Sequence, residues 1–163
     1  MDNLSLRFVR WGAGLLILGL LTGYGPLGHY LMGGADPSCP TAPVHGHMTL
    51  LGWVGMTLFG LVYRALPGWA NGREPAAGLV RVHFYLSVVG AIGSWATSTF
   101  GYSILKLIRP DFYYAPDMPL VRIWFGVDGV FLSIYGVGCL LFLWSLMRST
   151  VYAAESTPRP AAA

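Results

Sequence analysis

Four long stretches of the chain contain almost no charged residues, and this pattern limits the fold more than any other feature. Residues 11–28, 37–63 and 82–105 have no Lys, Arg, Asp or Glu, and residues 123–147 have only Asp128. Each stretch is close to or longer than the roughly 18–20 apolar residues that cross a hydrocarbon core of about 30 Å. The chain is 55% hydrophobic and 10% charged, whereas about a quarter of the residues of an average soluble domain are charged. These observations predict an integral membrane protein.

The segments between these stretches predict a single domain. Pro, Gly and Asp punctuate residues 32–42, 67–78 and 106–120, which is typical of helix ends and short connections. We therefore expect an all-α, four-helix transmembrane bundle in contact with the lipid bilayer. The bundle is expected to occupy residues 1–150, with a disordered tail at residues 151–163. The predicted helices cover residues 8–31, 43–66, 79–105 and 121–147.

The positions of the basic residues predict how the bundle lies in the membrane. Four spans place both termini on one side, and seven basic residues fall on that side against three on the other: Arg7, Arg10, Arg64, Arg73, Arg81, Arg148 and Arg159 against Lys106, Arg109 and Arg122. This imbalance favours cytoplasmic termini in a multi-pass protein of the bacterial inner membrane. The net charge of +3 then reflects topology, and we expect no nucleic-acid partner.

Two histidines, His45 and His47, stand one residue apart at the head of the second apolar stretch. At about 100° per residue their side chains point in directions about 200° apart. One metal ion would prefer a spacing of four residues, so two separate sites suit the pair better. Haem takes axial histidine and needs an apolar slot between helices. The glycines of the apolar stretches could provide such slots, although close helix packing is their usual role.

A resemblance to a known family strengthens the haem interpretation. The segment HGHMTLLGWVGMTLFGLVYRALPGW, residues 45–69, resembles the tenth transmembrane helix of haem-copper oxidase subunit I and its nitric oxide reductase relatives, where H-x-H precedes spaced glycines and a closing aromatic residue and proline. The segment VRVHFYLSVVG, residues 80–90, resembles the start of the next helix. The resemblance implies that His45 binds a high-spin, gas-reactive haem and His47 a low-spin haem, with b-type haem expected.

The chain resembles only the last four helices of that twelve-helix family. The family's copper-binding histidines and its second low-spin haem ligand lie on helices that have no counterpart here, so one copy cannot form a complete oxygen or nitric oxide reductase. Because His45 and His47 point in opposite directions, one of them is expected to point out of its own bundle. This favours a homo-oligomer with haem at subunit interfaces.

Other residues are candidates for completing the site. His29 is at the right depth to be a second axial ligand, or it is an interfacial histidine that touches lipid headgroups. The resemblance implies that Arg109 and Arg122 bind haem propionates, for which guanidinium groups are suited; snorkelling at the interface is the alternative. His83 resembles a family position that binds no cofactor, and the resemblance therefore implies a structural role. It is also expected roughly 25–30 Å away along the helices, too far to share the site of the other histidines within one subunit.

Asp128 is a functional candidate because a carboxylate inside an apolar span is costly. It could deliver protons, orient a haem-binding histidine through a hydrogen bond, or form an ion pair with Arg122. Of the two cysteines, Cys139 is expected to be a buried apolar residue, and Cys39 is a weaker candidate metal ligand beside His45.

Three functions remain open from the sequence. The first, which we predict, is a membrane haem protein related to haem-copper oxidase subunit I that accepts electrons from a cytochrome or quinol. One axial histidine would allow O2 or NO binding and haem-dependent oxidoreductase activity, whereas two would favour electron transfer. The second is a subunit or assembly factor of a respiratory oxidase or reductase complex. The third is a copper- or haem-handling protein whose candidate ligands are Met32, Cys39, His45, His47 and Met48.

Overall fold

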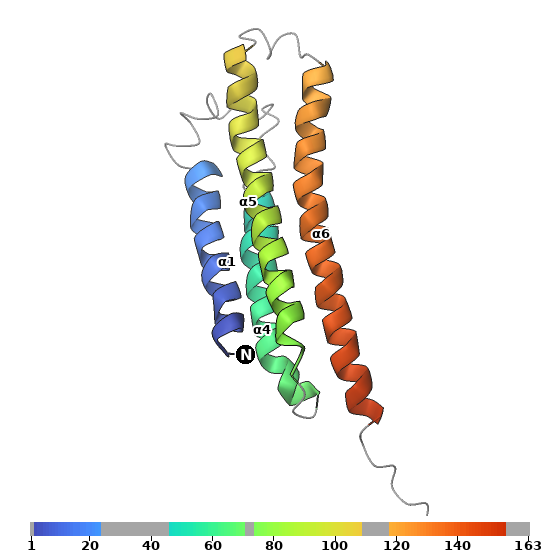
Figure 1. Ribbon diagram of the computed structural model, residues 1–163. Coiled ribbons are helices and arrows are strands. Elements are labelled where there is room, and N and C mark those ends of the chain that lie inside the picture. Colours follow the sequence, from blue (N-terminus) through green and yellow to red (C-terminus); the bar gives the residue numbers. More distant parts are fainter. Residues whose placement is uncertain (1, 24–45, 71–73, 109–117, 156–163) are drawn as a thin grey trace, which may run out of the picture.

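The computed structural model describes residues 2–23, 46–70, 74–108 and 118–155, and it is almost entirely helical in these ranges (Figure 1). Four long helices form the fold: α1 (Asp2–Gly23), a helix made of η1 (Met48–Gly55) followed directly by α4 (Met56–Trp69), α5 (Ala77–Ile108) and α6 (Met118–Glu155). The described residues contain no β-strand. The predicted all-α class with four helices is confirmed.

Helices α1, α5 and α6 are longer than the apolar stretches that predicted them. α1 begins at Asp2 rather than near residue 8, and α6 continues to Glu155, beyond the predicted end at residue 147 and into the segment expected to be a tail. Backbone hydrogen bonding propagates through polar residues once a helix is nucleated. Hydropathy therefore marks the part of each helix suited to the membrane and underestimates its length.

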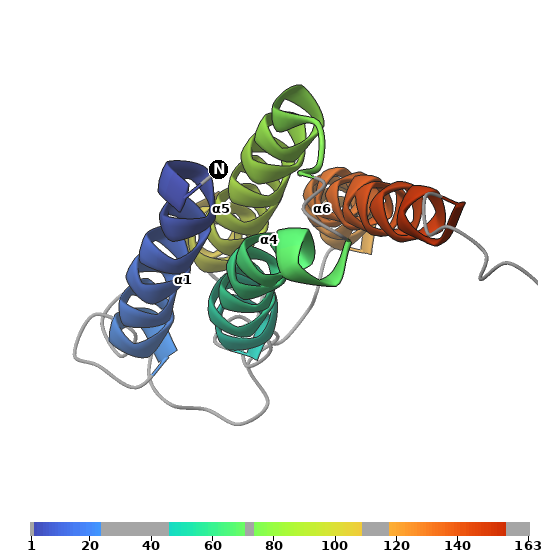
Figure 2. The same ribbon diagram turned by 90° about the horizontal axis from the view of Figure 1, so that it is seen from below.

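The helices run alternately up and down, so that α1 begins and α6 ends at the same end of the bundle (Figure 1). α5 packs along α6, and α1 packs along η1 and α4. Seen along the bundle, α4 lies between α1 and α6 (Figure 2), and weaker contacts join α1 to α5 and α4 to α6. At the end away from the N-terminus, α5 and α6 extend past α1 and η1 (Figure 1).

Glycines allow α1 to approach the helix formed by η1 and α4 very closely. A Cβ atom added at Gly60 would lie 2.7 Å from the Ser5 carbonyl oxygen, and one added at Gly52 would lie 2.9 Å from Cβ of Leu15. Contacts this short require a missing side chain, and small residues at helix crossings are typical of membrane bundles. These glycines therefore serve close helix packing.

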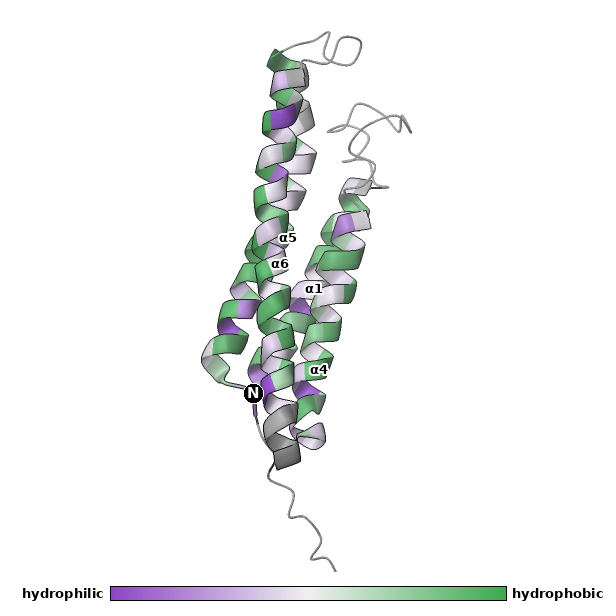
Figure 3. Cartoon of the chain, turned by 90° about the vertical axis from the view of Figure 1, so that its right-hand side faces the viewer, coloured by the Kyte–Doolittle hydropathy of each residue, from purple (hydrophilic) through white to green (hydrophobic). Residues whose placement is uncertain are grey.

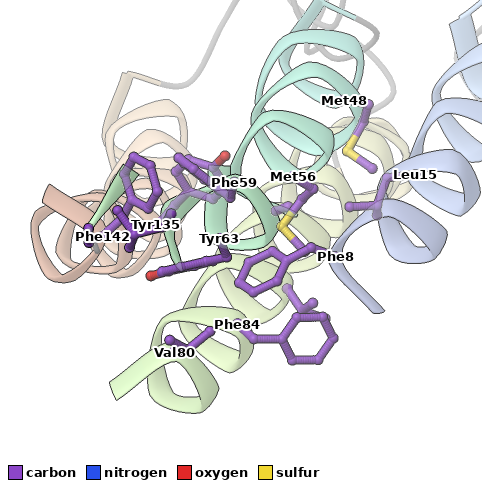
Figure 4. Packing of buried hydrophobic residues seen from close by; sticks show 14 residues of the cluster. Phe8, Leu15, Met48, Met56, Phe59, Tyr63, Val80, Phe84, Tyr135 and Phe142 are labelled. Atoms are coloured by element: carbon purple, nitrogen blue, oxygen red, sulfur yellow. The ribbon is translucent and has the colours of Figure 1, made fainter. Parts of the chain in front are cut away.

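The core is richest in aromatic residues towards the end where the chain begins. Figure 4 shows the rings of Phe8, Phe59, Tyr63 and Phe142 among the buried side chains. The Phe59 and Phe142 ring centroids are 4.7 Å apart, and those of Tyr63 and Phe142 are 5.4 Å apart at an interplanar angle of 87°. Edge-to-face and tilted pairs of this kind stabilise a core beyond the area that they bury.

The outward faces of the bundle are strongly apolar. Large hydrophobic side chains such as Leu50, Leu61 and Leu140 are more than half exposed, and hydrophobic residues dominate much of the face seen in Figure 3. All four helices are long and apolar enough to cross a membrane, over Asn3–Thr22, Met48–Trp69, Ala77–Gly101 and Arg122–Thr150. A surface of this kind is suited to lipid, so the architecture is that of a multi-pass membrane protein.

Candidate functional site

The structure describes part of the predicted haem site. His47 has α-helical backbone angles (φ −62°, ψ −44°) and directly precedes η1. Its side chain is half-buried, between the exposed Gly46 and the buried Met48, and its imidazole makes no hydrogen bond to another described residue. No described residue therefore occupies its ring nitrogens. His45, His29, Cys39 and Arg109 lie outside the described residues.

The helix that follows His47 begins as a π-helix, which the sequence analysis did not predict. Residues Met48–Gly55 form this turn type, which is rare and frequent at functional sites. The Tyr135 hydroxyl of α6 donates a 2.7 Å hydrogen bond to the Leu51 carbonyl oxygen, and the same hydroxyl fills the space where Gly55 would otherwise carry a side chain. A side chain that inserts into the backbone hydrogen-bond pattern is one known cause of altered helical pairing.

Some of the glycines that were expected to provide haem slots lie against other helices, and others face open space. The space beside Gly12, Gly52 and Gly60 is filled from within the bundle, by residues of α1 or of η1 and α4. By contrast, an added Cβ would meet nothing within 4 Å at Gly14, Gly46, Gly126, Gly129 and Gly136. The spaces beside Gly12, Gly52 and Gly60 are therefore not available to a macrocycle within a single chain, whereas no described residue fills the space beside Gly46.

Two further predicted site residues lie on α6. Arg122 is exposed near the start of this helix, at the same end of the bundle as His47. Asp128 is half-buried, and its Oδ1 accepts a 2.6 Å hydrogen bond from the Ser94 hydroxyl of α5. In the described part of the chain this serine, rather than Arg122, is the partner of Asp128. The carboxylate therefore links α5 to α6 inside the apolar region.

His83 lies at the centre of the core. It is 0% exposed, and the centroids of three phenylalanine rings, Phe8, Phe59 and Phe142, lie 5.0, 4.6 and 5.6 Å from its own. Its Nδ1 is 2.9 Å from the Tyr63 hydroxyl oxygen, in a buried hydrogen bond between α5 and α4. A structural role was predicted for His83, and this burial leaves no room for a macrocycle beside it.

Several polar atoms around His83 have no partner. Nε2 of His83, Oγ of Ser87 and Oγ of Ser145 are fully buried and make no hydrogen bond within the described residues. Ser145 nonetheless lies beside the Tyr63 hydroxyl. The sequence analysis missed this cluster, although two signals pointed to it: Ser87 follows His83 by one helical turn, and both interrupt an apolar stretch.

No group of three or more His, Cys, Asp or Glu side chains that could hold a metal ion is present among the described residues. Cys139 is a free, half-buried cysteine of α6.

No protein-family model matches the chain, and comparison with curated proteins and with solved structures finds no match. The assignment of function therefore depends on the residues themselves.

Proposed function

We propose that the protein is a membrane haem protein related to haem-copper oxidase subunit I, which binds b-type haem through His45 and His47 and serves electron transfer or O2/NO binding. One observation carries the proposal: His47 is half-buried and makes no hydrogen bond to another described residue. An imidazole in this position, at the edge of an apolar helix, is available as an axial ligand from one side of the bundle.

The chain's own residues would bind and orient the cofactor. His47 supplies an imidazole nitrogen on a rigid helix, His45 supplies one on a different side, and His29 is the candidate for a further axial position. Arg122 and Arg109 would pair with the propionates. Bound haem supplies one-electron redox chemistry and, where an axial position is open, the binding of a diatomic gas.

We further propose that the site is formed between two copies of the chain. The support is the packing described above, in which neighbouring side chains fill the space beside Gly12, Gly52 and Gly60. A planar cofactor beside His47 would then be covered on its outer face by a second copy. Native mass spectrometry would test this point, because a haem-loaded monomer as the only species would contradict it.

The proposed setting is the bacterial inner membrane, with both chain termini in the cytoplasm and a cytochrome or quinol as electron donor. The orientation is supported by the exposed arginines at the end where α1 begins, which are Arg7, Arg10, Arg64, Arg81 and Arg148. Positive residues near span ends favour the cytoplasmic side. Accessibility of single cysteines introduced beside Arg10 and beside Arg122 in sealed vesicles would test it.

The central test is the reduced-minus-oxidised visible spectrum of the purified protein, with and without CO. We expect sharp reduced haem bands that are lost or altered in His45→Ala and in His47→Ala, and a CO-induced shift that depends on His45. His83→Gln is the matched control, because this histidine is sealed in the core and its replacement should leave the haem bands in place. A protein that takes up no haem contradicts the proposal and would favour a subunit of a larger respiratory complex.

A further inference from the structure

The end of the bundle at which α1 begins carries exposed arginines from all four helices. They are Arg7, Arg10, Arg64, Arg81 and Arg148. None of the five forms an ion pair or a hydrogen bond with another residue that the structure describes. Positive charge at the end of a membrane span attracts anionic lipid headgroups. This end of the bundle is therefore suited to a membrane surface that contains such lipids.

Two of these arginines lie at the same depth on neighbouring helices. Arg7 and Arg81 are each about one turn inside the part of their helix that is suited to the membrane. α1 and α5 run in the same direction (Figure 1). Phe8 directly follows Arg7, Phe84 lies one turn after Arg81, and the centroids of these two rings are 5.0 Å apart. The two arginines therefore belong to turns that face each other at one level of the bundle.

The helix faces that carry these arginines meet at an aromatic contact. Trp11 lies one turn after Arg7 on the same face of α1, and Phe84 lies one turn after Arg81 on the same face of α5. The Trp11 and Phe84 ring centroids are 6.4 Å apart, with an interplanar angle of 76°. Arg7 and Arg81 therefore flank the line along which α1 meets α5, which we call the α1–α5 seam.

The aromatic residues beside these arginines are exposed. Trp11 is 43% exposed, and Tyr85, whose ring centroid is 5.4 Å from that of Phe84, is 54% exposed. Neither Trp11 nor Tyr85 forms a hydrogen bond with another described residue. Tryptophan and tyrosine are enriched at the level of lipid headgroups, because one end of the ring is apolar and the other is polar. This pattern places Arg7 and Arg81 at headgroup level.

Further from this end, the surface along the α1–α5 seam is apolar. Gly14 on α1 and Val89 on α5 each lie one turn beyond the exposed aromatic residues. A Cβ atom added at Gly14 would meet nothing within 4 Å, and Val89 is 49% exposed. Near the opposite end, Trp95 Nε1 donates a 3.3 Å hydrogen bond to the Thr22 hydroxyl and joins the two helices again. A surface of this kind is suited to an acyl chain.

We propose that Arg7 and Arg81 together bind the phosphate group of one anionic phospholipid, whose acyl chain lies along the α1–α5 seam beside Gly14. Guanidinium groups form strong, charge-assisted hydrogen bonds with phosphate oxygens. A second copy of the chain fits this surface less well. A two-fold axis along the membrane normal would bring its arginines to the same depth, so that like charges would meet. This inference is independent of the proposed haem function.

The test is native mass spectrometry of the delipidated full chain in detergent, titrated with dioleoyl phosphatidylglycerol. We expect one lipid to bind more tightly than any further ones, and dioleoyl phosphatidylcholine to bind about tenfold more weakly. Arg7→Gln and Arg81→Gln should each weaken the binding of the first phosphatidylglycerol about tenfold, because each removes a charge-assisted hydrogen bond. Arg148→Gln is the matched control, since it removes the same charge from α6 at the same end. Two bound lipids, one lost in each of the first two variants, would overturn the shared site.

A larger side chain in the seam tests the position of the acyl chain. Gly14→Leu should also weaken the binding of phosphatidylglycerol, whereas Gly136→Leu, which faces open space on α6, should not. Equal binding of the two lipids, or equal losses in Arg7→Gln and Arg148→Gln, would overturn the proposal, because the attraction would then be diffuse.

Two further outcomes would assign the surface to a different occupant. Displacement of the lipid by an equal concentration of inorganic phosphate would mean that the arginines bind a free anion. A dimer that forms without lipid and is lost in Gly14→Leu would mean that a second copy covers the seam. His47→Ala should bind phosphatidylglycerol as the wild type does, so the lipid and haem proposals can fail separately.

Discussion

Two histidines at opposite ends of the bundle differ in their burial and in their hydrogen bonding. At the end where α1 and α5 begin, His83 is 0% exposed and hydrogen-bonded to Tyr63. At the opposite end, His47 is half-buried and makes no hydrogen bond to another described residue. Both lie in apolar sequence, so composition does not separate them. The difference comes from packing, because helices surround the first residue and only partly cover the second.

Under the proposed function, this contrast would let the two histidines serve different purposes. A sealed imidazole can only exchange hydrogen bonds with its neighbours, whereas one at the edge can bind a cofactor from outside the bundle. At the end where His83 lies, which we call the closed end, the helices approach one another closely. At the other end, the open end, the described residues cover His47 only in part. Substitutions at the two ends should therefore lower the free energy of unfolding by different amounts.

The largest effect is expected from a glycine at the closed end. In Gly60→Ala the new methyl group would lie 2.7 Å from the Ser5 carbonyl oxygen, so α1 must move away from α4. We expect the free energy of unfolding, measured by titration with a denaturing detergent, to fall by about 3 kcal/mol. Gly46→Ala, at the open end of the same helix, meets no neighbour and should change the stability little. Equal losses in both variants would remove the distinction between the ends.

A second prediction concerns Asp128, the half-buried carboxylate of α6. Ser94→Ala removes the hydroxyl that donates to Oδ1 of Asp128 at 2.6 Å. We expect a loss of about 2 kcal/mol, since hydrogen bonds to charged groups are stronger than neutral ones. Ser133→Ala is the control, because this exposed serine bonds only to the Gly129 carbonyl of its own helix. If Ser94→Ala is as stable as the control, an ion pair of Asp128 is the better account.

The sequence was sufficient to predict the fold class and the number of spans, because a hydrocarbon core imposes length and apolarity on every helix that crosses it. It was not sufficient to predict helix ends such as Asp2 and Glu155, which lie outside that core. Nor could it predict the Tyr63–His83 hydrogen bond. Those residues are 20 positions apart on different helices, and which faces meet depends on the packing of the whole bundle.

The candidate site was predicted only in part, for a related reason. The H-x-H spacing identifies His47 as a candidate ligand through local geometry alone. The π-helix that follows it depends on Tyr135, which is far away in sequence and donates to Leu51 across the bundle. The glycines were interpreted as slots because sequence does not reveal which neighbour fills the space beside each one. Both features therefore depend on long-range contacts.

A third prediction tests the sealed pair directly. Tyr63→Phe leaves Nδ1 of His83 without its buried partner at 2.9 Å. We expect the free energy of unfolding to fall by about 1.5 kcal/mol, the cost of an unsatisfied buried polar group. Tyr85→Phe is the matched control in α5, because that side chain is exposed. Adding His83→Leu to Tyr63→Phe should recover part of the loss, since both polar partners are then gone. A double variant with the full sum of the two single losses would argue against an energetic link.

The smallest effect on stability is expected for the hydrogen bond between α6 and η1, which lies between the two ends. Tyr135→Phe removes the 2.7 Å hydrogen bond to the Leu51 carbonyl oxygen, which we expect to cost about 1 kcal/mol. Because that bond is a candidate cause of the π-helical pairing of Met48–Gly55, backbone amides in this segment should exchange hydrogen at a changed rate, while amides of α5 beside His83 should not. Unchanged exchange in η1 would mean that the π-helix is maintained by the close packing of Gly52 and Gly55 instead. Close approach of helices at glycines would then determine the backbone geometry at the open end, as it does the packing at the closed end.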